Sequence, residues 1–195
     1  MQEEAEGDVP ERVQDEVRMK LHAEEIGRRY DEAATAHEMW RPLKELAGIG
    51  RMRRRLLSRV RGEVLEVAVG TGASLRHYPL NHASDMTLAA VDISPGMLGL
   101  ARREARRLGI ELDARVMDAE RLEHPANRFD TVICAFSVCT FPDPEAALGE
   151  MRRVCRLLFE PAHHLLLVGG VELIETLHRG PHYCGAVRRK ALALE

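Results

Sequence analysis

The chain contains 195 residues, of which 45% are hydrophobic and 30% are charged, a composition that suits one domain with a complete core. Its apolar runs are too short to span a membrane, and its charge-rich first twenty-five residues do not resemble a signal peptide. Four cysteines without a C-x-x-C pair indicate reduced thiols, so a cytoplasmic location is predicted. The net charge of −3 is unevenly spread, since residues 1–25 hold nine acids and three bases.

The first part of the chain is predicted to be helical after an acidic tail. Residues 1–15 are expected to be solvated and disordered, and apolar residues at helical spacing from 16 to 46 predict a helical cap. Residues 51–61 carry six arginines around apolar positions at helical spacing, which predicts a helix that exposes its arginines to solvent. No aromatic residues are interleaved with these arginines, so no nucleic-acid partner is expected.

The most informative stretch is residues 64–72, Val-Leu-Glu-Val-Ala-Val-Gly-Thr-Gly. Its apolar residues predict a buried strand that ends at Gly70 and Gly72, and a helix is predicted to begin at residues 73–75. A strand, a glycine turn and a helix start place backbone N–H groups beside a nucleotide-like ligand. A dinucleotide-binding turn would need a third glycine at Leu75, which disfavours a nicotinamide oxidoreductase but leaves it as an alternative.

Two later strands are each predicted to end in an acid. Residues 87–91 run directly into Asp92, twenty residues after Gly72, at the place where an acid can hold a ribose diol. Residues 112–117 lead in the same way to Asp118. The acids would therefore meet at one edge of the sheet.

Helix signals separate these strands. Ser94 and Pro95 suit the N-cap and first position of a helix that should end at Gly109. After a strand at residues 131–136, Asp143 and Pro144 repeat the same start. Each of these two strands is therefore predicted to be followed by a helix that packs on the sheet.

Five strand–helix units at steps of about thirty residues predict an α/β fold, doubly wound, with a mostly parallel Rossmann-like sheet. Right-handed crossovers would bring the glycine turn, the two acids and Ser137 to one edge of that sheet, where ligands bind. A single domain is predicted over residues 16–195. It comprises the helical cap and lead-in helix (16–61), a cofactor-binding core (62–170) and an atypical, shortened C-terminal end (171–195).

The E-x-A-x-G-x-G turn at residues 66–72 and the acid that follows it resemble those of class I S-adenosylmethionine-dependent methyltransferases. The resemblance covers residues 30–156. It extends to the small bacterial methyltransferases grouped with ubiquinone/menaquinone C-methyltransferases and phosphatidylethanolamine N-methyltransferases, on Arg55, His77-Tyr78-Pro79, Cys139 and Asp143-Pro144. It implies methyl transfer from S-adenosylmethionine, with S-adenosylhomocysteine as product, to a small or lipid-like acceptor.

The resemblance also implies which residues bind the cofactor. These are Tyr30, Glu66, Ala68, Gly70, Gly72, Asp92, Ile93, Met97, Asp118, Ala119 and Ser137. For Tyr30 and Met97, simple packing in the core remains an equally good interpretation. His77 or His37 would serve as general base where the acceptor must lose a proton.

An apolar loop of residues 137–141, roofed by Tyr30 and Trp40, would suit a hydrophobic acceptor and at most peripheral membrane contact. A metal site is not expected, because His178, His182 and Cys184 lack a fourth ligand.

The C-terminal end departs from the family pattern, because the usual Pro-Gly-Gly turn before the fifth strand is absent. Residues 165–168 can still form this strand, but its outer edge needs a partner. Residues 171–177 have the pattern to fold back as a short cover, but the prediction is that the edge is left open, which gives a homodimer by edge pairing or strand exchange, or a poorly soluble monomer. A protein that binds the cofactor without catalysis and acts through assembly is the alternative from another functional class.

Overall fold

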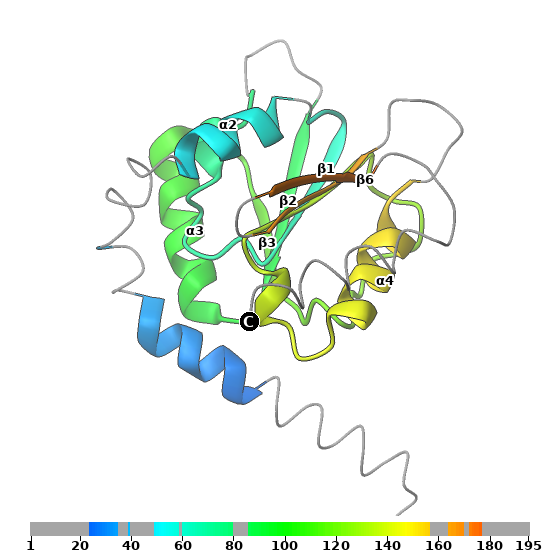
Figure 1. The fold of residues 1–195 in the computed structure, drawn as a ribbon. Helices are drawn as coiled ribbons and strands as arrows, with labels where there is room; N and C mark the ends of the chain where they lie inside the picture. The colour runs from blue at the N-terminus through cyan, green and yellow to red at the C-terminus, as the bar shows by residue number, and fades with distance from the viewer. Residues whose placement is uncertain are drawn as a thin grey trace, which may run out of the picture.

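The computed structural model describes residues 24–34, 39, 49–58, 60–79, 86–156, 164–169 and 172–176. A six-stranded sheet with the order β3-β2-β1-β4-β5-β6 forms its centre (Figure 1). Five strands pair in parallel, and the sixth runs antiparallel to the fifth. The strands are β1 (Glu63–Val67), β2 (Thr87–Asp92), β3 (Asp113–Val116), β4 (Thr131–Ala135), β5 (His164–Gly169) and β6 (Glu172–Thr176). The predicted α/β fold is confirmed.

The central strand β1 is buried on both of its faces, which explains its nearly continuous apolar sequence. Val64 packs with Leu56 and Leu57 of α2 (Gly50–Leu57) on one face. The next residue, Leu65, packs on the other face in the cluster that contains Met151. Helices on both faces are the arrangement that a parallel sheet requires.

Two longer helices cover opposite faces of this sheet (Figure 1). The Ser94 hydroxyl accepts a hydrogen bond from the Met97 amide and caps α3 (Pro95–Leu108), which ends at Gly109 in the left-handed conformation. On the other face, Asp143 accepts from two amides at the start of α4 (Pro144–Val154). The predicted caps are confirmed.

The prediction that a regular helix follows the glycine turn is wrong. Only a three-residue 3₁₀ helix, η2 (Leu75–His77), follows the turn. Pro79 gives the reason, because a proline disfavours helical conformation in the residue before it, and Tyr78 is extended with ψ at 139°. The lead-in helix is also shorter than predicted, since α2 ends at Leu57 rather than at residue 61.

The outer edge of β5 is covered within the chain. Strand β6 pairs antiparallel along it, from Leu165 opposite Thr176 to Gly169 opposite Glu172. The premise of the predicted dimer, an open β5 edge, is therefore wrong, because residues 172–176 form the short cover that the sequence pattern allowed. The homodimer stays a prediction, but an open β5 edge no longer supports it.

Several predicted features lie outside the described residues. These are the acidic tail at 1–15, His37, Trp40, His178, His182 and Cys184. Within the residues that the structure describes, none of the helices combines the length and apolar character needed to cross a membrane. The same residues contain no group of three His, Cys, Asp or Glu side chains placed to hold a metal ion.

Candidate functional site

A cavity of about 860 Å³ opens at the carboxyl edge of the parallel strands. The register explains why one edge collects its walls: Val67 of β1 lies opposite Val91 of β2 and Cys134 of β4. The residues that follow these strands must then be neighbours. They form a row from Asp118 and Asp92, across the glycine turn, to Ser137 beyond β4.

The two glycines of the turn serve different purposes. Gly70 has φ at +57° and lines the cavity, and an added Cβ would meet nothing within 4 Å. The open space beside it is therefore volume left for a ligand. Gly72 does not line the cavity. Its Cβ would come within 2.8 Å of the Leu75 side chain and 3.0 Å of the Ala101 backbone, so this glycine lets the turn pack on α3.

The Asp92 carboxylate fixes the turn at its own strand end. One oxygen accepts from the Gly70 amide at 2.8 Å and the other accepts from the Ser94 amide at 3.0 Å. Burial raises the pKa of this carboxyl above its ordinary value, although the amide hydrogen bonds act in the opposite direction. A carboxylate offers about four lone-pair sites, more than the amides of Gly70, Ile93 and Ser94 use, so the side chain can still accept from ligand hydroxyls.

A helix from the N-terminal part of the chain is docked over this strand end. Asp31 accepts from the Ser94 hydroxyl and, at 2.7 Å, from the Gly96 amide in the first turn of α3. Gly27 lies so close to the Ile93 carbonyl that an added Cβ would be 3.1 Å away. These contacts hold helical residues 24–34 against the β2–α3 loop and bring Tyr30 to the cavity.

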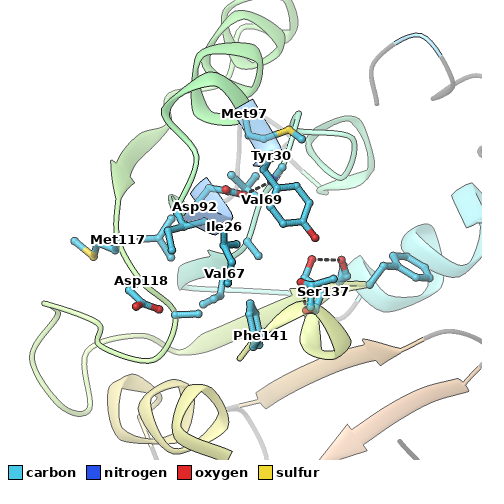
Figure 2. A pocket seen from close by; sticks show the side chains of 18 of the residues that line it. Ile26, Tyr30, Val67, Val69, Asp92, Met97, Met117, Asp118, Ser137 and Phe141 are labelled. Carbon is cyan, nitrogen blue, oxygen red and sulfur yellow. Dashed lines mark hydrogen bonds between the residues drawn. The ribbon is translucent and has the colours of Figure 1, made fainter. Parts of the chain in front are cut away.

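The other end of the cavity lies beyond β4. Phe136 follows this strand with φ at +64°, a conformation that bulky residues rarely adopt. The Arg53 guanidinium of α2 lies 5.2 Å from the centre of its ring. Figure 2 shows the Tyr30 hydroxyl pointing across the cavity toward Ser137, while Asp92 and Asp118 lie on the opposite side.

Most of the predicted cofactor residues line this single cavity. They are Tyr30, Ala68, Gly70, Asp92, Ile93, Met97, Asp118, Ala119 and Ser137. Three predicted residues are not among its lining residues, namely Glu66, Gly72 and His77. No histidine lines the described part of the cavity, and the role of His77 as base stays a prediction.

Glu66 lies behind the wall rather than in it. Its side chain is 2% exposed, and the Tyr78 hydroxyl donates to its carboxylate at 2.8 Å. Burial raises the pKa of Glu66, an effect that the hydrogen bonds from Ser74 and Tyr78 and the charge of Arg53 only partly offset. Its position supports the glycine turn from beneath.

Sequence reasoning missed three residues around the cavity. Nothing in the local sequence indicates that Asp31 accepts hydrogen bonds from Ser94 and Gly96 at the start of α3. The prediction that all arginines of the lead-in helix face solvent is wrong for Arg53, which is half-buried and lines the cavity. The positive φ of Phe136 has no signal in the sequence.

The arrangement suits an adenosyl group with a reactive end. Carboxylates at two adjacent strand ends can accept from ribose and adenine donors, and the buried Met97 offers an apolar surface for a base. The space beside Gly70 admits a ligand close to the backbone. The adenosyl end would lie over β2 and β3, and the reactive end beside β4.

Comparison with known proteins agrees with this geometry. Residues 64–157 match the family model described as a methyltransferase domain. A phosphatidylethanolamine N-methyltransferase from Cereibacter sphaeroides is 42% identical over 97 residues, which cover 49% of this chain and 46% of that protein. A demethylmenaquinone methyltransferase from Thermus thermophilus is 33% identical over 129 residues, which cover 64% of this chain and 58% of that protein.

Solved structures also share this fold. A crystal structure of an S-adenosylmethionine-dependent methyltransferase from Aquifex aeolicus superposes with a TM-score of 0.50 at 20% identity, over 66% of this chain and 70% of that one. At this identity the likeness concerns the fold alone. The chain spans about half the length of the two curated relatives that it matches. None of these comparisons supports a nicotinamide oxidoreductase.

Proposed function

Since residues 64–157 match the family model of a methyltransferase domain and two curated methyltransferases are 33–42% identical to parts of the chain, we propose that it transfers a methyl group from S-adenosylmethionine to a small or lipid-like acceptor. One observation carries the proposal: a single cavity joins Asp92 and Asp118, on the adenosyl side, to an apolar region beyond β4. A methyl donor and an acceptor need one shared cavity, because the acceptor's nucleophilic atom, the methyl carbon and the sulfur must be aligned.

The donor supplies a methyl group that is already activated on a sulfonium. The acceptor's nucleophilic atom forms the new bond to carbon as the methyl–sulfur bond breaks, and both electrons of that bond leave with the neutral thioether. The protein therefore has to bind and align its two ligands more than to activate them. Asp92 would hold the ribose hydroxyls, Asp118 the adenine amino group, and Tyr30 would close the cavity from above.

The acceptor region favours an apolar molecule. The residues that line the cavity away from its strand ends are mainly apolar, namely Ile26, Ile49, Phe136, Phe141 and Pro142, and they are joined by Glu25, Tyr30, Ser137 and Thr140. Apolar walls with a few placed polar groups are typical of sites for hydrophobic small molecules. The names of the two relatives, one acting on phosphatidylethanolamine and one on demethylmenaquinone, agree with this class of acceptor.

A methyl-transfer screen tests the proposal. The full chain is incubated with donor labelled in its methyl group and with naphthoquinols, phosphatidylethanolamine vesicles, a thiol and a hydrophilic amine. Label in a quinol or lipid product is the expected result. Turnover of the hydrophilic amine alone would reject the apolar acceptor. Tight binding of S-adenosylhomocysteine without any transfer would instead favour the non-catalytic alternative.

A further inference from the structure

Arg53 differs from its neighbouring arginines on α2 in its burial. Its neighbours Arg54 and Arg55 on α2 are exposed, whereas Arg53 is half-buried and lines the cavity. It is the only basic side chain among the described residues that line it. A cation is thus brought into a region whose other walls are mainly apolar.

The surrounding residues fix the orientation of this cation. The guanidinium lies 5.2 Å from the centre of the Phe136 ring, in cation–π contact. Phe136 presents its ring from a backbone with φ at +64°, a strained conformation of the kind that persists mainly at functional sites. A guanidinium that stacks by its face still has N–H donors along its edge.

The position along the sheet edge places Arg53 at the reactive end of the cavity. Phe136 follows β4, and β4 lies on the side of β1 opposite to β2. Under the proposed function, the carboxylates at the ends of β2 and β3 would hold the donor's ribose and adenine. Arg53 is therefore separated from the adenosyl side by the glycine turn, and it lies where the acceptor must enter.

We propose that Arg53 binds an anionic oxygen of the methyl acceptor and so selects acceptors that carry one close to the nucleophilic atom. The proposal rests on the proposed methyl transfer. An arginine in an apolar site is well suited to a phosphate or phenolate oxygen, because charge-assisted hydrogen bonds are strongest where water is excluded. Two acceptor types share this chemistry: a phospholipid, through its phosphate, and an aromatic alcohol, through its ionised oxygen.

The test measures binding as well as turnover. Full-length chain saturated with S-adenosylhomocysteine is titrated with glycerophosphoethanolamine, with 1-naphthol and with 1-methoxynaphthalene, which has no ionisable oxygen. Arg53→Met removes the charge at similar length, and Arg53→Lys keeps the charge without the planar fork. Arg54→Met is the matched control, because Arg54 is the exposed neighbour on the same helix. Thermal melting establishes that each variant is folded.

Arg53→Met should weaken binding of glycerophosphoethanolamine or of 1-naphthol by about 10- to 100-fold. Arg53→Lys should recover part of this loss, and Arg54→Met should bind as the unmodified chain does. Binding of S-adenosylhomocysteine should stay within about twofold in all variants, and the acceptor KM should rise more than kcat falls. Loss confined to the phosphate compound identifies a phospholipid headgroup, and loss confined to 1-naphthol identifies a phenolic acceptor.

Three results would overturn the proposal. The first is unchanged binding of glycerophosphoethanolamine and of 1-naphthol in Arg53→Met, and the second is no binding of either probe by the unmodified chain. The third is an equal loss for 1-methoxynaphthalene, which would make Arg53 a packing residue. If Arg53→Met transfers label with an unchanged KM, the inference fails while the methyltransferase function stands. If the unmodified chain neither binds S-adenosylhomocysteine nor transfers label, the proposed function itself fails.

Discussion

The half of the cavity beside β2 and β3 consists of strand ends with residues 24–34 docked over them, whereas the half beside β4 combines one face of α2, a loop and the Tyr30 side chain that points across from the docked helix. In the first half, Asp92 and Gly70 follow directly from strands held in register by backbone pairing. In the second, Tyr30 and Arg53 come from helices that precede the sheet in the chain. Strand pairing fixes the donor side rigidly, while the acceptor side depends on how helices pack and can change without altering the sheet.

The largest effect is expected from a substitution that disrupts donor binding at the glycine turn. Gly70→Val should reduce S-adenosylhomocysteine affinity by more than about 100-fold, because its methyl groups would fill volume that the ligand needs. The φ of +57° also costs about 1–2 kcal/mol of stability for a residue with a side chain.

Calorimetry with S-adenosylhomocysteine measures the affinity, and Gly149→Ala is the control. Gly149 is an exposed glycine in α4 whose added Cβ meets nothing within 4 Å, and alanine there should leave the affinity unchanged. A Gly70→Val protein that folds and binds normally would contradict the assignment of the donor to this turn.

The next effect concerns the acid beside the turn. Asp92→Ala should lose about 1.5–3 kcal/mol of donor binding free energy, because it removes the expected ribose contact and leaves the Gly70 and Ser94 amides without their acceptor. Asp92→Asn should lose less, since its one oxygen can replace only part of the carboxylate. The exposed Asp113→Ala is the control in the same titration. Unchanged affinity in Asp92→Ala would show that the donor lies elsewhere.

The contrast between the two halves also explains what the sequence can predict. Alternating apolar residues followed by a glycine or an acid identify strand ends, and parallel pairing brings these ends to one edge of the sheet. The positions of Gly70, Asp92 and Asp118 beside the cavity can therefore be predicted from the sequence. Arg53 is not, because helical periodicity separates buried from exposed positions but cannot show that one side chain borders a cavity. The short η2 was predictable, since Tyr78-Pro79 already disfavours a longer helix.

A third prediction addresses the junction between the halves. Asp31→Ala removes the acceptor for the Ser94 hydroxyl and the Gly96 amide, which should free residues 24–34 from α3. The affinity for S-adenosylhomocysteine should fall by less than in Asp92→Ala, because Asp31 acts only by docking the helix, and the loss is limited by its two hydrogen bonds, each worth roughly 1.5–3 kcal/mol to a charged acceptor.

Hydrogen exchange of residues 24–34 should rise in the same variant. Glu32→Ala is the matched control, since Glu32 is exposed and, among the described residues, pairs with Arg28 on the same helix. Equal exchange rates in Asp31→Ala and the unmodified chain would show that Asp31 does not hold this helix.

The smallest effect is on stability as a function of pH, and it concerns the support beneath the turn. Burial raises the pKa of Glu66 above its ordinary value of 4.5, so the folded state binds this proton more tightly than the unfolded state does. The resulting contribution to stability is complete below pH 4.5 and is lost as the pH rises through the raised pKa. Glu66→Gln keeps an oxygen for the Tyr78 hydroxyl but has no charge to bury.

Denaturant unfolding from pH 5 to pH 8 should therefore show a smaller loss of unfolding free energy in Glu66→Gln than in the unmodified chain. Some loss should remain in the variant, because burial also raises the pKa of Asp92. The exposed Glu111→Gln should follow the unmodified chain. Parallel curves for Glu66→Gln and the unmodified chain would mean that Arg53 and the hydrogen bonds fully offset the burial of this acid. In that case the donor side would depend on the charge of the same arginine that the acceptor is proposed to use.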